Sequence, residues 1–98
     1  MPDPMNVTRL HMHVRGRVQG VGFRAHVEYA ARRLGVTGWV RNVGYDSVET
    51  VAEGERAVLE RLVQAIKAGP RGSQVDDSTV EWLDATGKFE QFVVRRSI

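Results

Sequence analysis

Residues 10–34 read LHMHVRGRVQGVGFRAHVEYAARRL, a strand pattern, a glycine loop and a helix pattern in direct succession. Apolar and polar side chains alternate from Leu10 to Arg15, which is typical of a β-strand with one buried face. Residues 16–22 contain three glycines and are too rich in glycine for the interior of a helix or strand. Apolar side chains then recur at helical spacing, and Gly35 ends the pattern. They are Phe23, Val27, Ala30 and Leu34. The stretch therefore predicts a strand, a tight loop and a helix.

The rest of the chain adds a second helix and several strands. Four segments have strand character: 36–43, 48–52, 75–83 and 89–95. A short loop joins the first two, which predicts an antiparallel hairpin, and the last two supply one or two strands around a turn at 85–88. A helix is expected from about Glu55 to Ala68, with Gly69-Pro70 at its end. Its apolar side consists of Val58, Leu59, Leu62, Val63 and Ile66. The order βαββαβ predicts an α+β fold, the ferredoxin-like sandwich, in which both helices cover one face of an antiparallel sheet.

The length of 98 residues suits a single domain. Two prolines and an aspartate stand in the first four positions, so we expect a flexible tail at residues 1–6 and the domain at residues 7–98. No apolar run reaches the roughly 18 residues that span a bilayer, and no secretory signal is visible. The chain has no cysteine, which excludes disulfides, zinc–thiolate sites and thiol chemistry. The lack of cysteine is compatible with a reducing cytoplasm, where we expect the protein. We also expect a monomer with no membrane partner.

The positive charge comes almost entirely from arginine. The net charge is +2, and twelve of the fourteen basic residues are arginine. The planar guanidinium suits bidentate contact with phosphate or carboxylate, so one interpretation is an anionic ligand. The other is a general richness in arginine without functional meaning.

The glycine loop at residues 16–22 can form an anion cradle. Glycines allow successive backbone N–H groups to face one concave side, and the dipole of the following helix adds positive charge. Arg24 falls in the first turn of that helix, beside the loop. The alternative is a loop chosen only for tightness, with Arg24 solvated.

Two known nucleotide motifs do not fit this loop. The pattern G-x-x-x-x-G-K-[ST] is absent, which excludes a P-loop. Residues 20–25 do match G-x-G-x-x-[GA], with Asp46 about twenty residues later. However, Asp46 falls in a hairpin loop and the domain is too short for paired nucleotide-binding halves, so we interpret this match as chance.

Taken whole, two segments resemble the signatures of the acylphosphatase family. The first is GRVQGVGFR at residues 16–24, and the second is GWVRN at residues 38–42, followed by Val48 and Gly54. The resemblance extends over roughly residues 9–96. It implies the ferredoxin-like fold and metal-independent hydrolysis of acyl phosphates to carboxylate and inorganic phosphate.

The resemblance also implies roles for individual residues. Arg24 matches the family's phosphate-binding arginine, and Asn42 matches the asparagine that orients the attacking water. The loop whose amides hold the phosphoryl group corresponds to Gly16, Arg17, Val18, Gln19, Gly20 and Val21. Asp46 stands where the second signature has glycine, with Gly44 two residues earlier. If Asp46 adopts a left-handed conformation there, the turn after Asn42 is strained, and Asp46→Gly would relieve it.

This chemistry needs few groups. The leaving carboxylate of an acyl phosphate has a conjugate acid with a pKa of about 4, so it departs without a general acid. The remaining task is to hold a phosphoryl group and an in-line water, which an arginine, a loop of amides and an asparagine can do. An asparagine is too weak a base to take the water's proton, so we expect the substrate's own phosphate to accept it. No metal or cofactor is expected, and the partners are a small acyl phosphate and product phosphate.

Other residues receive structural interpretations. His11 and His13 alternate on one strand and could share a metal, but without a third ligand in reach we expect them to line the sheet face away from the helices. His26 points away from Arg24 on the helix and is expected at the surface. Trp39 and Trp82 are expected to pack. Asp76-Asp77 is expected to carry solvated charges at a strand start.

Two other function classes use this topology. RNA-recognition domains stack bases on aromatic side chains of the two central strands, but residues 48–52 contain no aromatic residue, so we expect no nucleic-acid partner. A relative of the acylphosphatase-like domains that act on carbamoyl phosphate in larger proteins remains the third interpretation.

Overall fold

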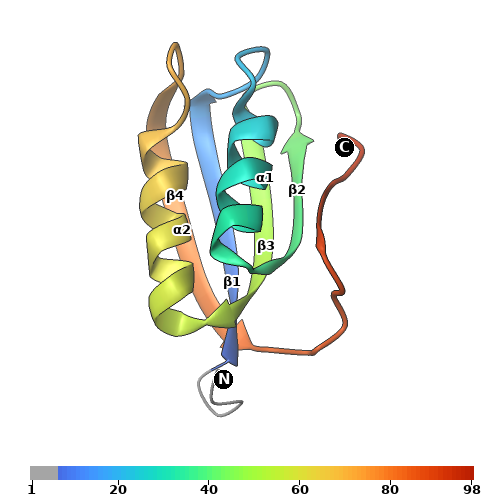
Figure 1. The fold of residues 1–98 in the computed structure, drawn as a ribbon. Coiled ribbons are helices and arrows are strands. Elements are labelled where there is room, and N and C mark those ends of the chain that lie inside the picture. Colours follow the sequence, from blue (N-terminus) through green and yellow to red (C-terminus); the bar gives the residue numbers. More distant parts are fainter. Residues whose placement is uncertain (1–6) are drawn as a thin grey trace.

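The computed structural model describes residues 7–98 and places two helices side by side on one face of a five-stranded sheet (Figure 1). The tail expected at residues 1–6 lies outside the described residues. In chain order the elements are β1 (Val7–Arg17), α1 (Phe23–Leu34), β2 (Thr37–Val43), β3 (Ser47–Glu55), α2 (Arg56–Ala68), β4 (Gln74–Asp84) and β5 (Phe92–Val94). The predicted ferredoxin-like fold is confirmed. Within residues 7–98, neither helix is long and apolar enough to cross a bilayer.

The sheet is antiparallel except at one edge. Its strand order is β4-β1-β3-β2-β5, and β1 pairs antiparallel with both β3 and β4. The last strand, β5, instead pairs parallel with β2, with Gly38 opposite Phe92. The chain crosses from β4 to the far edge of the sheet before it forms β5 (Figure 1). The sheet is therefore mixed, and the expected all-antiparallel pairing holds for the four long strands only.

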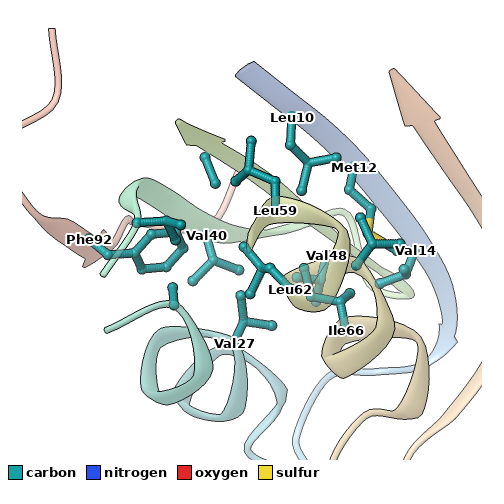
Figure 2. Close-up of a cluster of buried hydrophobic side chains, with 14 of the residues drawn as sticks. Leu10, Met12, Val14, Val27, Val40, Val48, Leu59, Leu62, Ile66 and Phe92 are labelled. Carbon is teal, nitrogen blue, oxygen red and sulfur yellow. The ribbon is translucent and has the colours of Figure 1, made fainter. Parts of the chain in front are cut away.

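The core lies between the helices and the sheet. On β1, Leu10, Met12 and Val14 face inward, because alternate side chains of a strand point to opposite faces. Figure 2 shows them in one cluster with side chains of both helices, of β2 and β3, and of β5. Those labelled there are Val27, Val40, Val48, Leu59, Leu62, Ile66 and Phe92. Burying one such side chain stabilises the fold by about 1.5–3 kcal/mol. The helix faces predicted from apolar spacing are thus the faces that pack.

The crossover from β4 to β5 is held by a buried carboxylate. Glu53 on β3 is only 5% exposed. One of its oxygens accepts hydrogen bonds from the backbone N–H of Thr86 at 2.9 Å and from Nε of Arg9 at 2.8 Å. The other accepts from the N–H of Gly87 at 2.9 Å. Glu53 therefore fixes the segment that delivers β5 to its edge.

We expect this carboxylate to make stability depend on acid pH. Burial alone raises the pKa of Glu53, but the hydrogen bonds from Thr86, Gly87 and Arg9 outweigh burial, and the pKa lies below its ordinary 4.5. A lowered pKa gives stability that is complete above 4.5 and is lost as the pH falls through the folded-state value. Glu53→Gln should lower the free energy of unfolding at pH 7 by about 2–4 kcal/mol and flatten its acid dependence. Urea unfolding between pH 3 and pH 7 measures both effects.

The matched control is Glu60→Gln on α2, whose carboxylate is 59% exposed and pairs with Arg56 at 3.3 Å. It should change the free energy of unfolding by less than about 0.5 kcal/mol. Equal losses in the two variants would contradict the role given to Glu53.

Candidate active site

The chain leaves β1 at a bulge and enters a loop that faces the first helix. The pairing of β1 with β4 shifts register between Arg15 and Gly16. A Cβ on Gly16 would lie 2.2 Å from the carbonyl oxygen of Gln74, so only glycine allows the two backbones to approach this closely. The bulge turns residues 18–22 out of the sheet toward the N-terminus of α1.

Backbone conformation in this loop favours anion binding. Gly20 and Gly22 have φ of 74° and 77°, whereas Val21 between them does not have a positive φ. Alternation of left- and right-handed residues turns successive N–H groups toward one concave side. The backbone N–H groups from Gln19 to Ala25 donate to no carbonyl of residues 7–98.

The start of α1 adds positive potential at the same place. Gly22 is the N-cap, no side chain caps the helix, and its first turn contains no acidic residue. The helix therefore presents unsatisfied N–H groups and the positive end of its dipole to the loop. A phosphate or carboxylate is the natural occupant of such a position.

Arg24 lies in the first turn of α1 and is half-buried. Among residues 7–98 its guanidinium has no hydrogen-bond or ion-pair partner. Glu28, one helical turn later, pairs instead with Arg32 at 3.3 Å. The charge of Arg24 is therefore available to an anion at the helix start.

Asn42 brings a second polar group to the same pocket. It lies on β2 opposite Val48 of β3, and its backbone carbonyl accepts a hydrogen bond from the N–H of Ile98 at 3.0 Å. Its side-chain oxygen, Oδ1, is buried and has no hydrogen-bond partner among the described residues. Leaving such an oxygen unsatisfied costs about 1–3 kcal/mol, so the position calls for a donor such as water.

A pocket of about 320 Å³ joins these groups. A water occupies roughly 30 Å³ in the liquid, so the pocket has room for a phosphoryl group, one water and part of an attached group. Its lining contains Val18, Gln19, Gly20, Gly22, Phe23, Arg24, Ala25, Glu28, Asn42 and Val94.

Five residues predicted from the sequence thus meet in this pocket, and three do not line it. Gly16 and Arg17 belong to β1, and Val21 packs against the core. The N–H of Gly16 donates to the carbonyl of Asp46 at 2.9 Å, so it is not free to bind phosphate. Sequence reasoning missed Glu28, although its spacing of four from Arg24 on one helix was a usable signal. It also missed Val94, which only the placement of β5 brings to the site.

The turn after Asn42 is not strained by Asp46. Asp46 does not have a positive φ, and Gly44 takes the left-handed conformation with a φ of 61°. The left-handed residue of this turn is therefore Gly44, two positions before Asp46. The condition for strain at Asp46 is therefore not met, and Asp46→Gly is not expected to relieve any.

The remaining candidates lie away from the pocket. His11 is on the sheet face opposite the helices, as expected, with Nε2 2.7 Å from a carboxylate oxygen of Glu49. Within residues 7–98, no three His, Cys, Asp or Glu side chains form a group that could hold a metal. His26 is half-buried between the helices rather than at the surface, because its Nε2 lies 3.0 Å from the carbonyl of Ala65 on α2.

The tryptophans and the aspartate pair fit their predictions. Trp39 is 9% exposed and packs beneath Arg41, whose guanidinium lies 4.7 Å from the ring centre. Trp82 is partly buried against the core. Asp77 is exposed on β4 and pairs with Arg15 of β1.

Comparisons of the sequence and of the structure with known proteins point to the same family. The family model for acylphosphatase matches residues 10–94. The chain belongs to the acylphosphatase family. The resemblance drawn from the two signatures is confirmed, and with it hydrolase activity on small acyl phosphates.

Individual acylphosphatases match over nearly their whole length. The acylphosphatase of Salinibacter ruber is 50% identical over 88 residues, which are 90% of this chain and 93% of that protein. The acylphosphatase structure from Coxiella burnetii superposes with a TM-score of 0.87 at 37% identity, covering 93% of this chain and 95% of that one. That from Bacillus subtilis gives 0.86 at 35% identity, covering 90% and 98%.

Proposed function

We propose that this acylphosphatase site breaks the carboxyl–phosphate bond by direct attack of a water on phosphorus, without a metal ion. The observation that carries the proposal is the buried, unpartnered Oδ1 of Asn42 in one pocket with an uncapped helix start and Arg24. One group can hold a water and the others can hold a phosphate.

The phosphoryl group is bound by charge and by backbone amides. Its oxygens accept hydrogen bonds from free N–H groups between Gln19 and Ala25 and from the guanidinium of Arg24. On this proposal the amide contacts lie nearer the helix than the segment from Gly16 to Val21 that the family resemblance implies. Donors fixed in advance stabilise charge on the phosphoryl oxygens without reorganising during the reaction.

Asn42 positions the nucleophile. Its Oδ1 accepts a hydrogen bond from a water and leaves a lone pair of that water directed at phosphorus. The bond between water oxygen and phosphorus forms as the bond to the acyl oxygen breaks. A phosphoryl oxygen of the substrate takes the proton, and the products are a carboxylate and inorganic phosphate.

The leaving group needs no protonation. A carboxylate is stable on departure at neutral pH, since its conjugate acid has a pKa of about 4. Glu28, the acidic residue of the pocket lining, is paired with Arg32 and has no assigned role as a proton donor. A phosphate monoester would leave as an alkoxide and would need such a donor.

A single assay series tests this function. In EDTA, acetyl phosphate and benzoyl phosphate should be hydrolysed at rates within about twofold of those with added Mg²⁺. Glycerol phosphate should react with a kcat/KM lower by at least about a hundredfold, which is the typical value of a missing general acid. Loss of acyl phosphate hydrolysis in EDTA, restored by a divalent ion, would refute the mechanism.

The proposal includes the oligomeric state of the protein and its location in the cell. We expect the protein to act as a monomer. The lack of cysteine suits a reducing cytoplasm. The RNA-binding alternative gains no support, because the inward and outward positions of β3 within Ser47–Glu55 carry no aromatic side chain for stacking bases.

A further inference from the structure

The side chain of Gln19 leaves the phosphate loop and ends among backbone carbonyls of the β2–β3 turn. Its Nε2 donates to the carbonyl oxygen of Ser47 at 2.9 Å and to that of Gly44 at 3.2 Å. The carbonyl oxygen of Val43 lies 3.4 Å away. Three acceptors surround this end of the side chain, so the amide nitrogen with its two hydrogens belongs there.

This contact joins two parts of the site that the sheet keeps apart. The loop containing Gln19 continues from β1, whereas Asn42 is on β2, and β3 lies between these strands. Val43, the residue after Asn42, carries one of the three carbonyl oxygens that accept from Nε2 of Gln19. The N–H of Gly16 also donates to the carbonyl of Asp46 in this turn, at 2.9 Å.

The contact uses the side chain and leaves the backbone of Gln19 free. Its own N–H has no carbonyl partner among the described residues and belongs to the anion cradle. Gln19 can therefore contact phosphate through its backbone N–H while its side chain hydrogen-bonds to the turn that follows Asn42.

We propose that the side chain of Gln19 is a positioning residue that sets the distance between the phosphoryl group and the water held by Asn42. This inference rests on the proposed function. A displacement of about 1 Å between reacting groups can cost on the order of a hundredfold in rate, so one donor group that fixes this distance has a large effect. Gln19 does this without contacting the water itself.

The test compares Gln19→Met with wild type and with Gln64→Met. Methionine keeps an unbranched side chain of similar length but cannot donate to the three carbonyls. Gln64 is an exposed residue of α2, which makes its replacement a matched control. Gln19→Met should lower kcat on acetyl phosphate by about 10- to 100-fold, with the dissociation constant of inorganic phosphate within about threefold of wild type. Gln64→Met should change neither.

Hydrogen exchange gives a readout that is independent of activity. The backbone amides of residues 44–48 should exchange faster in Gln19→Met than in Gln64→Met, because the turn loses its link to the loop. Exchange at residues 44–48 that is the same in both variants would overturn the proposed link.

Gln19→Glu supplies a rescue experiment. Its ionised carboxylate faces carbonyl oxygens and cannot donate, whereas the protonated form has one O–H donor. The ratio of its kcat to that of wild type should therefore rise as the pH falls from 7 to 4.5.

The outcomes separate the two proposals. Wild-type protein that fails to hydrolyse acyl phosphates would overturn the proposed function. Active wild type with an unchanged kcat in Gln19→Met would overturn only the role of Gln19. Equal losses of rate and phosphate affinity in Gln19→Met would also overturn it, since they would show a general collapse of the pocket.

Discussion

Replacing Arg24 by alanine is expected to lower kcat/KM for acetyl phosphate by at least about a hundredfold. The guanidinium is half-buried at the start of α1 and has no anionic partner among the described residues, which supports the proposal that its charge binds the substrate. A charge-assisted bidentate contact with phosphate is worth about 3 kcal/mol in such a setting, and every 1.4 kcal/mol is a factor of ten. Inorganic phosphate should bind more weakly by a similar factor, because product and substrate share this contact.

Two further variants make the Arg24 experiment specific. Arg24→Lys should recover only part of the loss, since an ammonium is a point charge without the fork of a guanidinium. Arg33→Ala removes the same charge from an exposed position of the same helix, outside the pocket lining. If Arg33→Ala were as damaging as Arg24→Ala, the effect would be one of overall charge and not of a bound phosphate.

Asn42→Ala is expected to separate catalysis from binding. Its Oδ1 is assigned to the water, so kcat should fall by about 100- to 1,000-fold while the dissociation constant of inorganic phosphate stays within about threefold. The free energy of unfolding should not fall, because the substitution removes a buried oxygen that has no partner in the described residues. Steady-state kinetics, phosphate titration and urea unfolding of one preparation test all three points.

Asn42→Asp distinguishes a water ligand from a phosphate ligand. A carboxylate at this position can still accept a hydrogen bond from water, but it repels the phosphoryl group, so both kcat and phosphate affinity should fall. Normal kcat in Asn42→Ala would remove the water-positioning role.

Periodicity in the sequence predicts most of the fold because the long elements pack by one face. Alternation around Leu10 and helical spacing around Val27 identify the surfaces that meet in the core. The strand β5 has only three residues, Phe92–Val94, which is too short for a periodic signal. Its parallel pairing with β2 depends on the crossover that Glu53 holds, and that contact spans distant parts of the chain.

The site is predictable where residue type alone carries the chemistry. Arg24 and Asn42 stand out through the two signatures, and the glycines of the loop indicate an anion cradle. The sequence does not predict which carbonyl group accepts each hydrogen bond. Two loops approach each other in space. As a result, the N–H of Gly16 donates to the carbonyl of Asp46, and the side chain of Gln19 donates to that of Ser47.

The central claim is that a water held by Asn42 attacks phosphorus, and isotope labelling tests it most directly. Acetyl phosphate is hydrolysed by the enzyme in water enriched in oxygen-18, with the uncatalysed reaction subtracted, and both products are analysed by mass spectrometry. The account predicts one labelled oxygen in inorganic phosphate and none in acetate. Label in acetate would show that water attacks the carbonyl carbon, and would contradict the assignment of Arg24, the loop amides and Asn42 to phosphoryl transfer.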